Sequence, residues 1–308
     1  MNSQQPVLVT GASGFIGSHL CRHLQADGHI VRGFSRNEAG FRGNILDRKA
    51  LNDACKGVQA VFHLAGNAAT ADQKRGDSPR THVQGARNVL AAAQDAGVGR
   101  LVFLSSALAA ELDEGQVPGQ AGDYARGKWE AERLVLAANG GGLLTTVLRP
   151  APVYGRGMKS GLATMIRLIR ARALPPLPKL EHGLSLVGVE DVCRAALLAA
   201  QSPAAAGQCW LLTDLQRYTA NEIEAAVYRA LGRAAPRWRT PAVVFFAAAA
   251  ALQLGRLAGS KSAESGLQTW RNLTRERIWP AGEIFKALDF QPAGTLYGKL
   301  PEIIRDLK

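Results

Sequence analysis

The chain has 308 residues, of which 47% are hydrophobic and 20% are charged, and this composition excludes a disordered or collagen-like protein. No secretory signal is expected, because the N-terminal residues carry neither a basic region nor an apolar one. The formal net charge is +12, and residues 151–308 contribute +9 of it. This excess would suit nucleic acid, an anionic membrane surface or phosphorylated small molecules.

Four cysteines are scattered along the chain at Cys21, Cys55, Cys193 and Cys209, with no CxxC spacing. Neither a metal site nor a disulfide framework is therefore predicted. A reducing, cytoplasmic location fits this cysteine usage.

Apolar runs typical of buried strands alternate with helical patterns through the first half of the chain. This alternation predicts an α/β protein with a doubly wound parallel sheet and helices on both of its faces. In chain order the predicted elements are the strand Val7–Thr10, the helix Phe15–Ala26, the strand His29–Ser35, the helix Arg48–Cys55, the strand Ala60–Ala65, the helix Pro79–Ala96, the strand Leu101–Ser106, the helix Tyr124–Ala138 and the strand Leu143–Leu148.

The pattern becomes irregular after Pro150, which predicts a smaller C-terminal lobe interleaved with the last strands of the sheet. Its predicted helices are Lys159–Ala173, Val189–Gln201, Thr219–Leu231 and Pro241–Leu257.

The first predicted strand ends in a glycine-rich turn, in which Gly11, Gly14 and Gly17 have a G-x-x-G-x-x-G spacing. Such a turn lets the backbone approach a pyrophosphate, toward which the following helix directs unpaired N–H groups. The strand before the turn and the helix after it give the context that a dinucleotide site requires. A tight turn that binds nothing is the alternative.

Arg36 follows the end of the second predicted strand, where an NAD site usually carries an acidic residue. A cation there favours NADP, whose 2′-phosphate it can bind, and NAD is the alternative cofactor. An ordinary solvated arginine is the other interpretation of this residue.

Tyr124 and Lys128 are four residues apart at the start of a predicted helix and therefore share one face. An ammonium beside a phenol lowers the phenol pKa from about 10, and a tyrosine tuned in this way can exchange a proton with a hydroxyl or a ketone. Ser105 and Ser106 end the preceding strand, where a serine hydroxyl can hold the substrate oxygen. A surface tyrosine is the alternative.

With these motifs in this order, the chain resembles the extended branch of the short-chain dehydrogenase/reductase superfamily, which contains sugar-nucleotide epimerases, dehydratases and reductases. The resemblance covers about residues 5–230 and implies a Rossmann-type NAD(P)-binding domain at 1–155. It also implies a substrate-binding lobe at 156–308, from which a segment at about 184–215 returns to the Rossmann core. The matching segments are TGASGFIG (10–17), GNILD (43–47), VFHLAG (61–66), GARNVLAAAQDAGVGRLVFLSS (85–106), YARGK (124–128), LRPAPVYGRG (148–157) and LVGVEDVCRAALLAA (186–200).

The resemblance implies a role for each matching residue. Ser106, Tyr124 and Lys128 would be catalytic, and Ser105 is the alternative candidate for the catalytic serine. Arg36 and a larger set would contact the cofactor: Gly11, Ser13, Gly14, Phe15, Ile16, Gly17, Ile45, Leu46, Asp47, Leu64, Ala65, Gly66, Tyr124, Lys128, Pro150 and Val153.

Two departures from the family pattern change the expected chemistry. His82 stands where the family usually has an asparagine that holds a water relay, and both a substitute role near the substrate and a place on the helix surface remain open. Ala107 and Leu108 follow Ser106, where sugar-nucleotide 4,6-dehydratases have an Asp-Glu pair, so dehydration is not expected.

The basic excess of the second half has two interpretations. A helix after the VYG motif could turn cations toward a substrate diphosphate, or it could carry them on a solvated face. These cations are Arg156, which we expect to contact substrate, and Lys159, Arg167, Arg170 and Arg172. Nucleic-acid binding is not predicted, because the chain shows no helix-turn-helix, RNP-like or zinc pattern.

The apolar run Ala242–Leu252 is too short to span a bilayer. Because cations and Trp238 precede it, with Arg256 and Lys261 beyond, peripheral contact with a membrane is one interpretation. A helix that packs in the core or covers the substrate is the favoured one.

The sequence therefore predicts an NADP-dependent oxidoreductase or epimerase that transfers hydride to or from a secondary alcohol or ketone. The predicted substrate is a nucleotide sugar that reacts at C4, by 4-ketoreduction or 4-epimerisation. One alternative is a hydroxysteroid- or dihydroflavonol-type reductase of an apolar ketone. Another, from a different class, is a non-catalytic dinucleotide-binding sensor or assembly factor. The resemblance also implies a homodimer.

Overall fold

A seven-stranded parallel sheet forms the centre of the computed structural model, which describes residues 5–36, 41–66, 77–113, 122–247, 250 and 274–307. The strand order is β10-β6-β5-β4-β1-β2-β3, and every neighbouring pair is parallel. The predicted doubly wound sheet is thereby confirmed. The strands are β1 (Val7–Thr10), β2 (Val31–Ser35), β3 (Phe41–Arg42), β4 (Ala60–His63), β5 (Arg100–Leu104), β6 (Leu144–Pro150) and β10 (Cys209–Leu212).

The order of the strands reverses between β1 and β4, because β2 and β3 lie on one side of β1 and the later strands on the other. In sheets of this kind, ligands bind outside the carboxyl ends of the strands at such a switch point. The residues that follow β1, β4, β5 and β6 are therefore the first place to look for a site.

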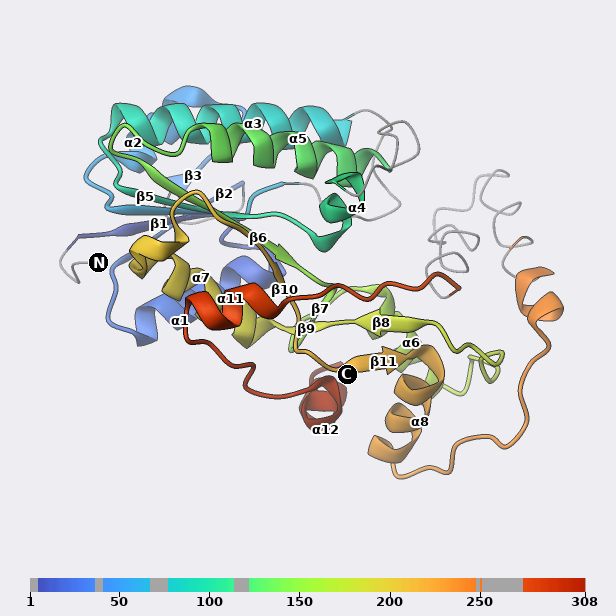
Figure 1. The fold of residues 1–308 in the computed structure, drawn as a ribbon. Helices are drawn as coiled ribbons and strands as arrows, with labels where there is room; N and C mark the ends of the chain where they lie inside the picture. Colours follow the sequence, from blue (N-terminus) through green and yellow to red (C-terminus); the bar gives the residue numbers. More distant parts are fainter. Residues whose placement is uncertain are drawn as a thin grey trace.

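Helices cover both faces of the sheet (Figure 1). The layer on one face contains α2, α3 and α5, and the layer on the other contains α1, α7 and the short α11. Their bounds are α1 (Phe15–Ala26), α2 (Arg48–Cys55), α3 (Asp77–Asp95), α5 (Asp123–Ala137), α7 (Val189–Gln201) and α11 (Gly282–Ala287); the single turns η1 (Ala107–Ala109), α4 (Ala110–Asp113) and η2 (Pro203–Ala205) complete this part.

The apolar core lies in two layers, one on each face of the sheet. Along β4, Val61 packs into the layer beneath α2, α3 and α5, and Phe62 packs into the layer beneath α1 and α7. Because successive side chains point to opposite faces, strands covered on both sides need an apolar residue at almost every position. This explains why the predicted strands are continuous apolar runs.

A second group of elements extends from the carboxyl ends of the strands (Figure 1). In it β7 pairs with β9 in parallel, β8 pairs with β11 in antiparallel fashion, and α6, α8 and α12 pack around a third apolar cluster. The bounds are β7 (Val153–Tyr154), β8 (Gly183–Ser185), β9 (Val187–Gly188), β11 (Arg217–Thr219), α6 (Gly161–Arg170), α8 (Ala220–Ala230) and α12 (Leu296–Asp306).

A buried carboxylate joins segments of this second group that are far apart in sequence. Asp214 accepts hydrogen bonds from the hydroxyls of Tyr154 at 3.0 Å and Tyr218 at 2.5 Å. The N–H of Leu296 donates in turn to the Tyr218 oxygen at 3.0 Å. Burial raises the pKa of Asp214, whereas the two hydroxyls that donate to the carboxylate lower it. The network fastens β7, β11 and the start of α12 together.

The described part of the predicted helix Pro241–Leu257 is helical at residues 242–247 but does not lie in the core. Val243 is 72% exposed and Phe246 is 46% exposed, whereas Phe245 packs against the small apolar cluster of Leu177 and Leu180. The interpretation as a core helix is therefore wrong for these residues. Residues 248–249 and 251–273, which include Arg256 and Lys261, lie outside the described residues, and membrane contact stays a prediction. Within the described ranges, no helix combines the length and apolarity needed to cross a membrane.

Candidate active site

The glycine-rich turn folds tightly against the end of β4. Gly11 has a φ of +75°, and its carbonyl accepts a hydrogen bond from the N–H of Gly14 at 2.9 Å. A Cβ on Gly17 would lie 2.1 Å from the Gly11 oxygen, and a Cβ on Gly11 would lie 2.9 Å from the nitrogen of Ala65. Glycine is therefore required by backbone conformation at Gly11 and by close packing at Gly17.

The helix that follows the turn begins without a side-chain cap. Its N-cap is Gly14, and both Ser13 and Gly14 are exposed. The side chains of Phe15 and Ile16 pack inward against apolar clusters. Exposed, uncapped N–H groups at a helix N-terminus suit an anion, so the turn fits the pyrophosphate of a dinucleotide.

Two cations lie together at the carboxyl end of β2. Arg36 is exposed, and the Nε of Arg42 in β3 donates to the Arg36 carbonyl at 3.0 Å. The N–H of Gly43 donates to the Ser35 carbonyl at 3.0 Å, which holds the two strand ends together. The sequence motifs did not indicate Arg42, because β3 is only two residues long and shows no periodicity.

The segment Ile45–Asp47, which is expected to contact the cofactor, lies next to this edge of the sheet. Ile45 is buried, and its carbonyl accepts a hydrogen bond from Asn88 at 3.0 Å. Leu46 and Asp47 are exposed, and one Asp47 oxygen caps α2 by accepting from the N–H of Ala50 at 3.1 Å. The Asp47 carboxylate therefore has a structural role that the resemblance did not imply.

Residues 64–66 leave the sheet directly after β4, beside the glycine-rich turn. Leu64 and Ala65 are half-buried and Gly66 is exposed. The N–H of Ala65 donates to Thr10 Oγ1 at 3.2 Å, and the same oxygen lies 2.8 Å from His63 Nδ1. Burial lowers the pKa of His63 to about 3, so this imidazole is neutral at physiological pH.

The predicted serine and tyrosine meet at the carboxyl end of β5. Ser106 caps the turn η1 by accepting from the N–H of Leu108 at 3.3 Å. Tyr124 lies in the first turn of α5, and its pKa is raised by burial, an effect that a hydrogen bond with Ser106 opposes. The sequence predicts a lowered pKa for the Tyr124 phenol. In the structure this pKa is raised instead, because burial disfavours the phenolate more than the hydrogen bond with Ser106 favours it.

Lys128 is buried one turn further along α5, with 4% of its surface exposed. Its Nζ donates to the carbonyl of Leu104 at 2.7 Å and lies 4.9 Å from the centroid of the Phe103 ring. Burial lowers the pKa of Lys128 to about 8, whereas the charge of Glu132 raises it. The hydrogen bond to the end of β5 fixes the ammonium beneath the segment that carries both serines.

His82 lies inside the site and not on the helix surface, with 1% of its surface exposed. Its ring meets the ring of Tyr124 edge-on, with centroids 5.5 Å apart. A Cβ on Gly66 would lie 2.4 Å from the His82 ring, and one on Gly127 would lie 3.3 Å from it. The absence of side chains at both positions makes room for the imidazole beside the tyrosine.

The segment after β6 leaves the sheet and contacts α12. Pro150 is buried at the end of β6, and Val153 is half-buried in β7. Arg156 turns its side chain toward α12, where its Nε lies 3.5 Å from an oxygen of Asp306 and 3.8 Å from one of Glu302. The arginine predicted to meet substrate is therefore paired with carboxylates, and its substrate role stays a prediction.

Ser105 lies near Glu132, a residue that the sequence motifs did not indicate. It is buried, and its hydroxyl lowers the pKa of Glu132, which burial raises. Glu132 is 1% exposed and forms an ion pair with Arg149 at 2.5 Å. The sequence signal was a glutamate one turn after Lys128 on the same helix face. Ser106 is the serine that forms a hydrogen bond with Tyr124, and its catalytic role stays a prediction.

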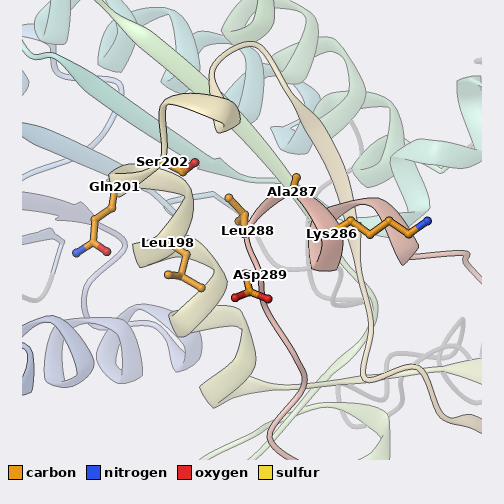
Figure 2. Close-up of a pocket in the computed structure, with 7 residues that line it drawn as sticks. All are labelled: Leu198, Gln201, Ser202, Lys286, Ala287, Leu288 and Asp289. Atoms are coloured by element: carbon orange, nitrogen blue, oxygen red, sulfur yellow. The ribbon is translucent and has the colours of Figure 1, made fainter.

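The hollow drawn in Figure 2 lies apart from these residues. It has a volume of about 310 Å³ and is lined by the end of α7 and by α11 with the residues after it. The end of α7 leads back to the start of β10, at the amino ends of the strands, whereas Ser106 follows the carboxyl end of β5. None of the predicted site residues lines it.

Comparison with known proteins places these features in a family. The model of the NAD dependent epimerase/dehydratase family matches residues 7–210. The 2-alkyl-3-oxoalkanoate reductase of Stenotrophomonas maltophilia is 30% identical over 75% of this chain and 76% of its own length. The 3 beta-hydroxysteroid dehydrogenase/Delta 5-->4-isomerase of Mycobacterium tuberculosis is 31% identical over 76% of this chain and 71% of its own.

A solved structure adds a bound cofactor to the comparison. MoeE5 in complex with UDP-glucose and NAD is 25% identical, with a TM-score of 0.76 over 98% of both chains. The family is named for NAD-dependent epimerases and dehydratases, and the two relatives are named for a reductase and a dehydrogenase/isomerase. They support the predicted enzyme over the alternative of a non-catalytic sensor.

Proposed function

Because the chain belongs to the NAD dependent epimerase/dehydratase family, an extended branch of the short-chain dehydrogenases/reductases, we propose that it is an NADP-dependent reductase of an apolar ketone. That it is an oxidoreductase or epimerase with a nicotinamide cofactor follows from the family and its relatives. The direction of the reaction, the preference for NADP and the substrate are the proposal.

The catalytic roles rest on the cluster at the end of β5. Tyr124 would donate the proton to the ketone oxygen, Ser106 would hold that oxygen, and Lys128 would bind the nicotinamide ribose and favour the phenolate after proton transfer. The bound nicotinamide would supply the hydride. His82 would hold the Tyr124 ring in place through their edge-on contact. The single observation that carries the catalytic assignment is the placement of Lys128 beneath the serine segment.

The choice of an apolar substrate rests on two observations. Two relatives at 30% and 31% identity are named for alkyl-oxoalkanoate and steroid substrates. Arg156, the cation expected to meet a substrate diphosphate, instead pairs with Asp306 and Glu302. A nucleotide sugar is the second candidate, favoured by the family model and by the bound UDP-glucose of MoeE5. For this substrate the reaction would be 4-ketoreduction or 4-epimerisation.

The test of the substrate is a panel assay of cofactor oxidation. A 3-ketosteroid and a 2-alkyl-3-oxoalkanoate represent the apolar class, and a UDP-4-keto sugar represents the other. We expect kcat/KM to be at least about tenfold higher for an apolar ketone. Turnover of the UDP-4-keto sugar alone would establish the second candidate. Because a 4-epimerase regenerates its cofactor and shows no net oxidation, UDP-glucose is also assayed for conversion to its 4-epimer, and the absence of all these reactions would reject both candidates.

The preference for NADP rests on the pair of cations at the end of β2. Arg36→Ala and Arg42→Ala should each raise the Kd of NADPH about tenfold, because each removes a charge-assisted hydrogen bond to the 2′-phosphate. Their Kd for NADH should stay within about twofold. Lys56→Ala is the matched control, since this exposed cation lies between the end of α2 and the start of β4, away from the carboxyl end of β2. Equal effects on NADPH and NADH would reject the assignment.

The remaining expectations about the protein's surroundings are also proposals. A reducing cytoplasm fits the four cysteines, all of which lie in described segments and form no disulfide. The predicted division of the chain between residues 155 and 156 and the predicted homodimer stay predictions. The chemistry proposed for the site depends on neither of them.

A further inference from the structure

A chain of polar contacts runs behind the catalytic residues, across α4, α5 and β6. Arg149 donates to both oxygens of Glu132, through Nε at 3.0 and 3.1 Å and through Nη2 at 2.5 Å. Its Nη1 donates to Asp113 at 2.5 Å, and the indole of Trp129 donates to the other Asp113 oxygen at 2.8 Å. Both oxygens of Glu132 act as acceptors in this fork, which is the arrangement of an ionised carboxylate.

The buried part of this cluster contains one carboxylate on the same helix face as Lys128. Arg149 is shared between Glu132 and Asp113, and Asp113, whose side chain is 49% exposed, also faces the charge of Arg133, so Glu132 is the buried carboxylate that can favour the Lys128 ammonium. Lys128 and Glu132 are four residues apart on α5, so their side chains lie on one face of the helix. Lys128 donates a hydrogen bond to the neutral carbonyl of Leu104, and Glu132 is the charged group that favours its ammonium.

The other titratable groups around Lys128 do not supply this negative charge. His63 on β4 is neutral, because burial lowers its pKa to about 3. Tyr124 on α5 has a raised pKa, and burial raises the pKa of Cys209 on β10, beside Glu132 and Arg149, to about 12. Uncompensated burial of an ammonium is costly, so without Glu132 the amine would lose its proton more easily.

We propose that Glu132, held in place by Arg149, is a positioning residue of the active site that keeps Lys128 charged beneath Ser106 and Tyr124. This inference rests on the proposed function, because the charge of Lys128 matters only if Lys128 serves the cofactor and the tyrosine. Arg149 directly precedes Pro150 on β6, so the same pair also ties the end of β6 to α5.

Substitution of Glu132 by glutamine tests the proposal, because the amide keeps the shape and can still accept from Arg149. The high-pH limb of the kcat profile should move down by about one pH unit or more. Glu132→Asp retains the charge and should restore most of the shift. Glu130→Gln is the matched control: Glu130 lies on the same helix, with its carboxylate 43% exposed and 3.9 Å from Arg126, and its profile should not move.

A second readout needs no turnover. Protein labelled with ¹³C at lysine Cε allows the Lys128 amine to be titrated by NMR, with Lys128→Arg to assign its signal among ten lysines. The Lys128 signal should titrate at lower pH in Glu132→Gln than in the wild type. If the signal shifts but no ketone is turned over, the proposed function fails and the link between the charges stands.

Unchanged titration and an unchanged pH profile in a folded Glu132→Gln protein would overturn the inference. If this variant does not fold, Asp113→Asn decides, because Asp113 belongs to the same cluster and is 49% exposed. A smaller shift in the same direction supports the proposal, and no shift in Asp113→Asn overturns it.

Discussion

Replacement of Gly17 by alanine should weaken dinucleotide binding without unfolding the protein. The new Cβ would lie 2.1 Å from the carbonyl oxygen of Gly11 and 2.8 Å from its carbonyl carbon. Ordinary van der Waals contact begins near 3.4 Å, so the turn and the first turn of α1 must separate by about 1 Å. Both partners are backbone atoms, and a change of side-chain rotamer cannot relieve the clash.

The size of each effect follows from this displacement. Overpacking costs about 1–3 kcal/mol, and exchange of a helical glycine for alanine returns about 0.5–1 kcal/mol. The net loss, at most roughly 2.5 kcal/mol, leaves the protein folded, with a Tm lower by no more than a few degrees. A shift of about 1 Å takes N–H groups out of hydrogen-bonding range of a pyrophosphate, so the Kd of NADPH should rise at least about tenfold.

The assay is a fluorescence titration with NADPH, with thermal unfolding as a check on the fold. Gly298→Ala is the matched control, because Gly298 also lies in the first turn of a helix, where a Cβ would meet no atom of another described segment within 4 Å. Its Tm should stay the same or rise slightly, and its Kd should not change. The reasoning is refuted if Gly17→Ala binds NADPH within twofold of the wild type.

Further predictions concern the buried groups outside the catalytic cluster. Tyr218→Phe removes a donor from Asp214 and an acceptor from the N–H of Leu296, so urea denaturation should show a loss of about 1–3 kcal/mol, whereas Tyr297→Phe should cost less. Burial raises the pKa of the Cys55 thiol to about 11 and those of Cys193 and Cys209 to about 12. These thiols should therefore react with a disulfide reagent at pH 8 at least about tenfold more slowly in the native than in the unfolded protein, and rapid native labelling mapped to Cys55 or Cys193 would contradict their burial.

The elements nearest the cofactor turn could be predicted residue by residue. β1 and α1 have the predicted bounds Val7–Thr10 and Phe15–Ala26, because the buried strand is uniformly apolar and the glycines mark the turn between them. β3, β7 and β9 were missed, since strands of two residues show no alternation. Both α11 and α12 lie beyond residue 230, where the family resemblance had faded.

The proximity of the candidate catalytic residues could be predicted because one helix face and one strand end bring them together. Tyr124 and Lys128 share a face of α5, and Ser106 follows the neighbouring β5. The Glu132–Arg149 pair could not be found in this way, because its partners lie on different elements and 17 residues apart. The orientation of Arg156 was also beyond sequence reasoning, because α12, which carries its partners, comes almost 150 residues later.

The central claim is that Tyr124 is the proton donor of a nicotinamide-dependent ketone reductase. The most direct measurement is kcat/KM for NADPH-dependent ketone reduction by Tyr124→Phe, together with its Kd for NADPH. We predict a loss of at least about 100-fold in kcat/KM, with the Kd within about threefold of the wild type, because phenylalanine keeps the ring beside His82 and removes only the hydroxyl. A Tyr124→Phe enzyme that reduces the ketone at the wild-type rate would contradict the account.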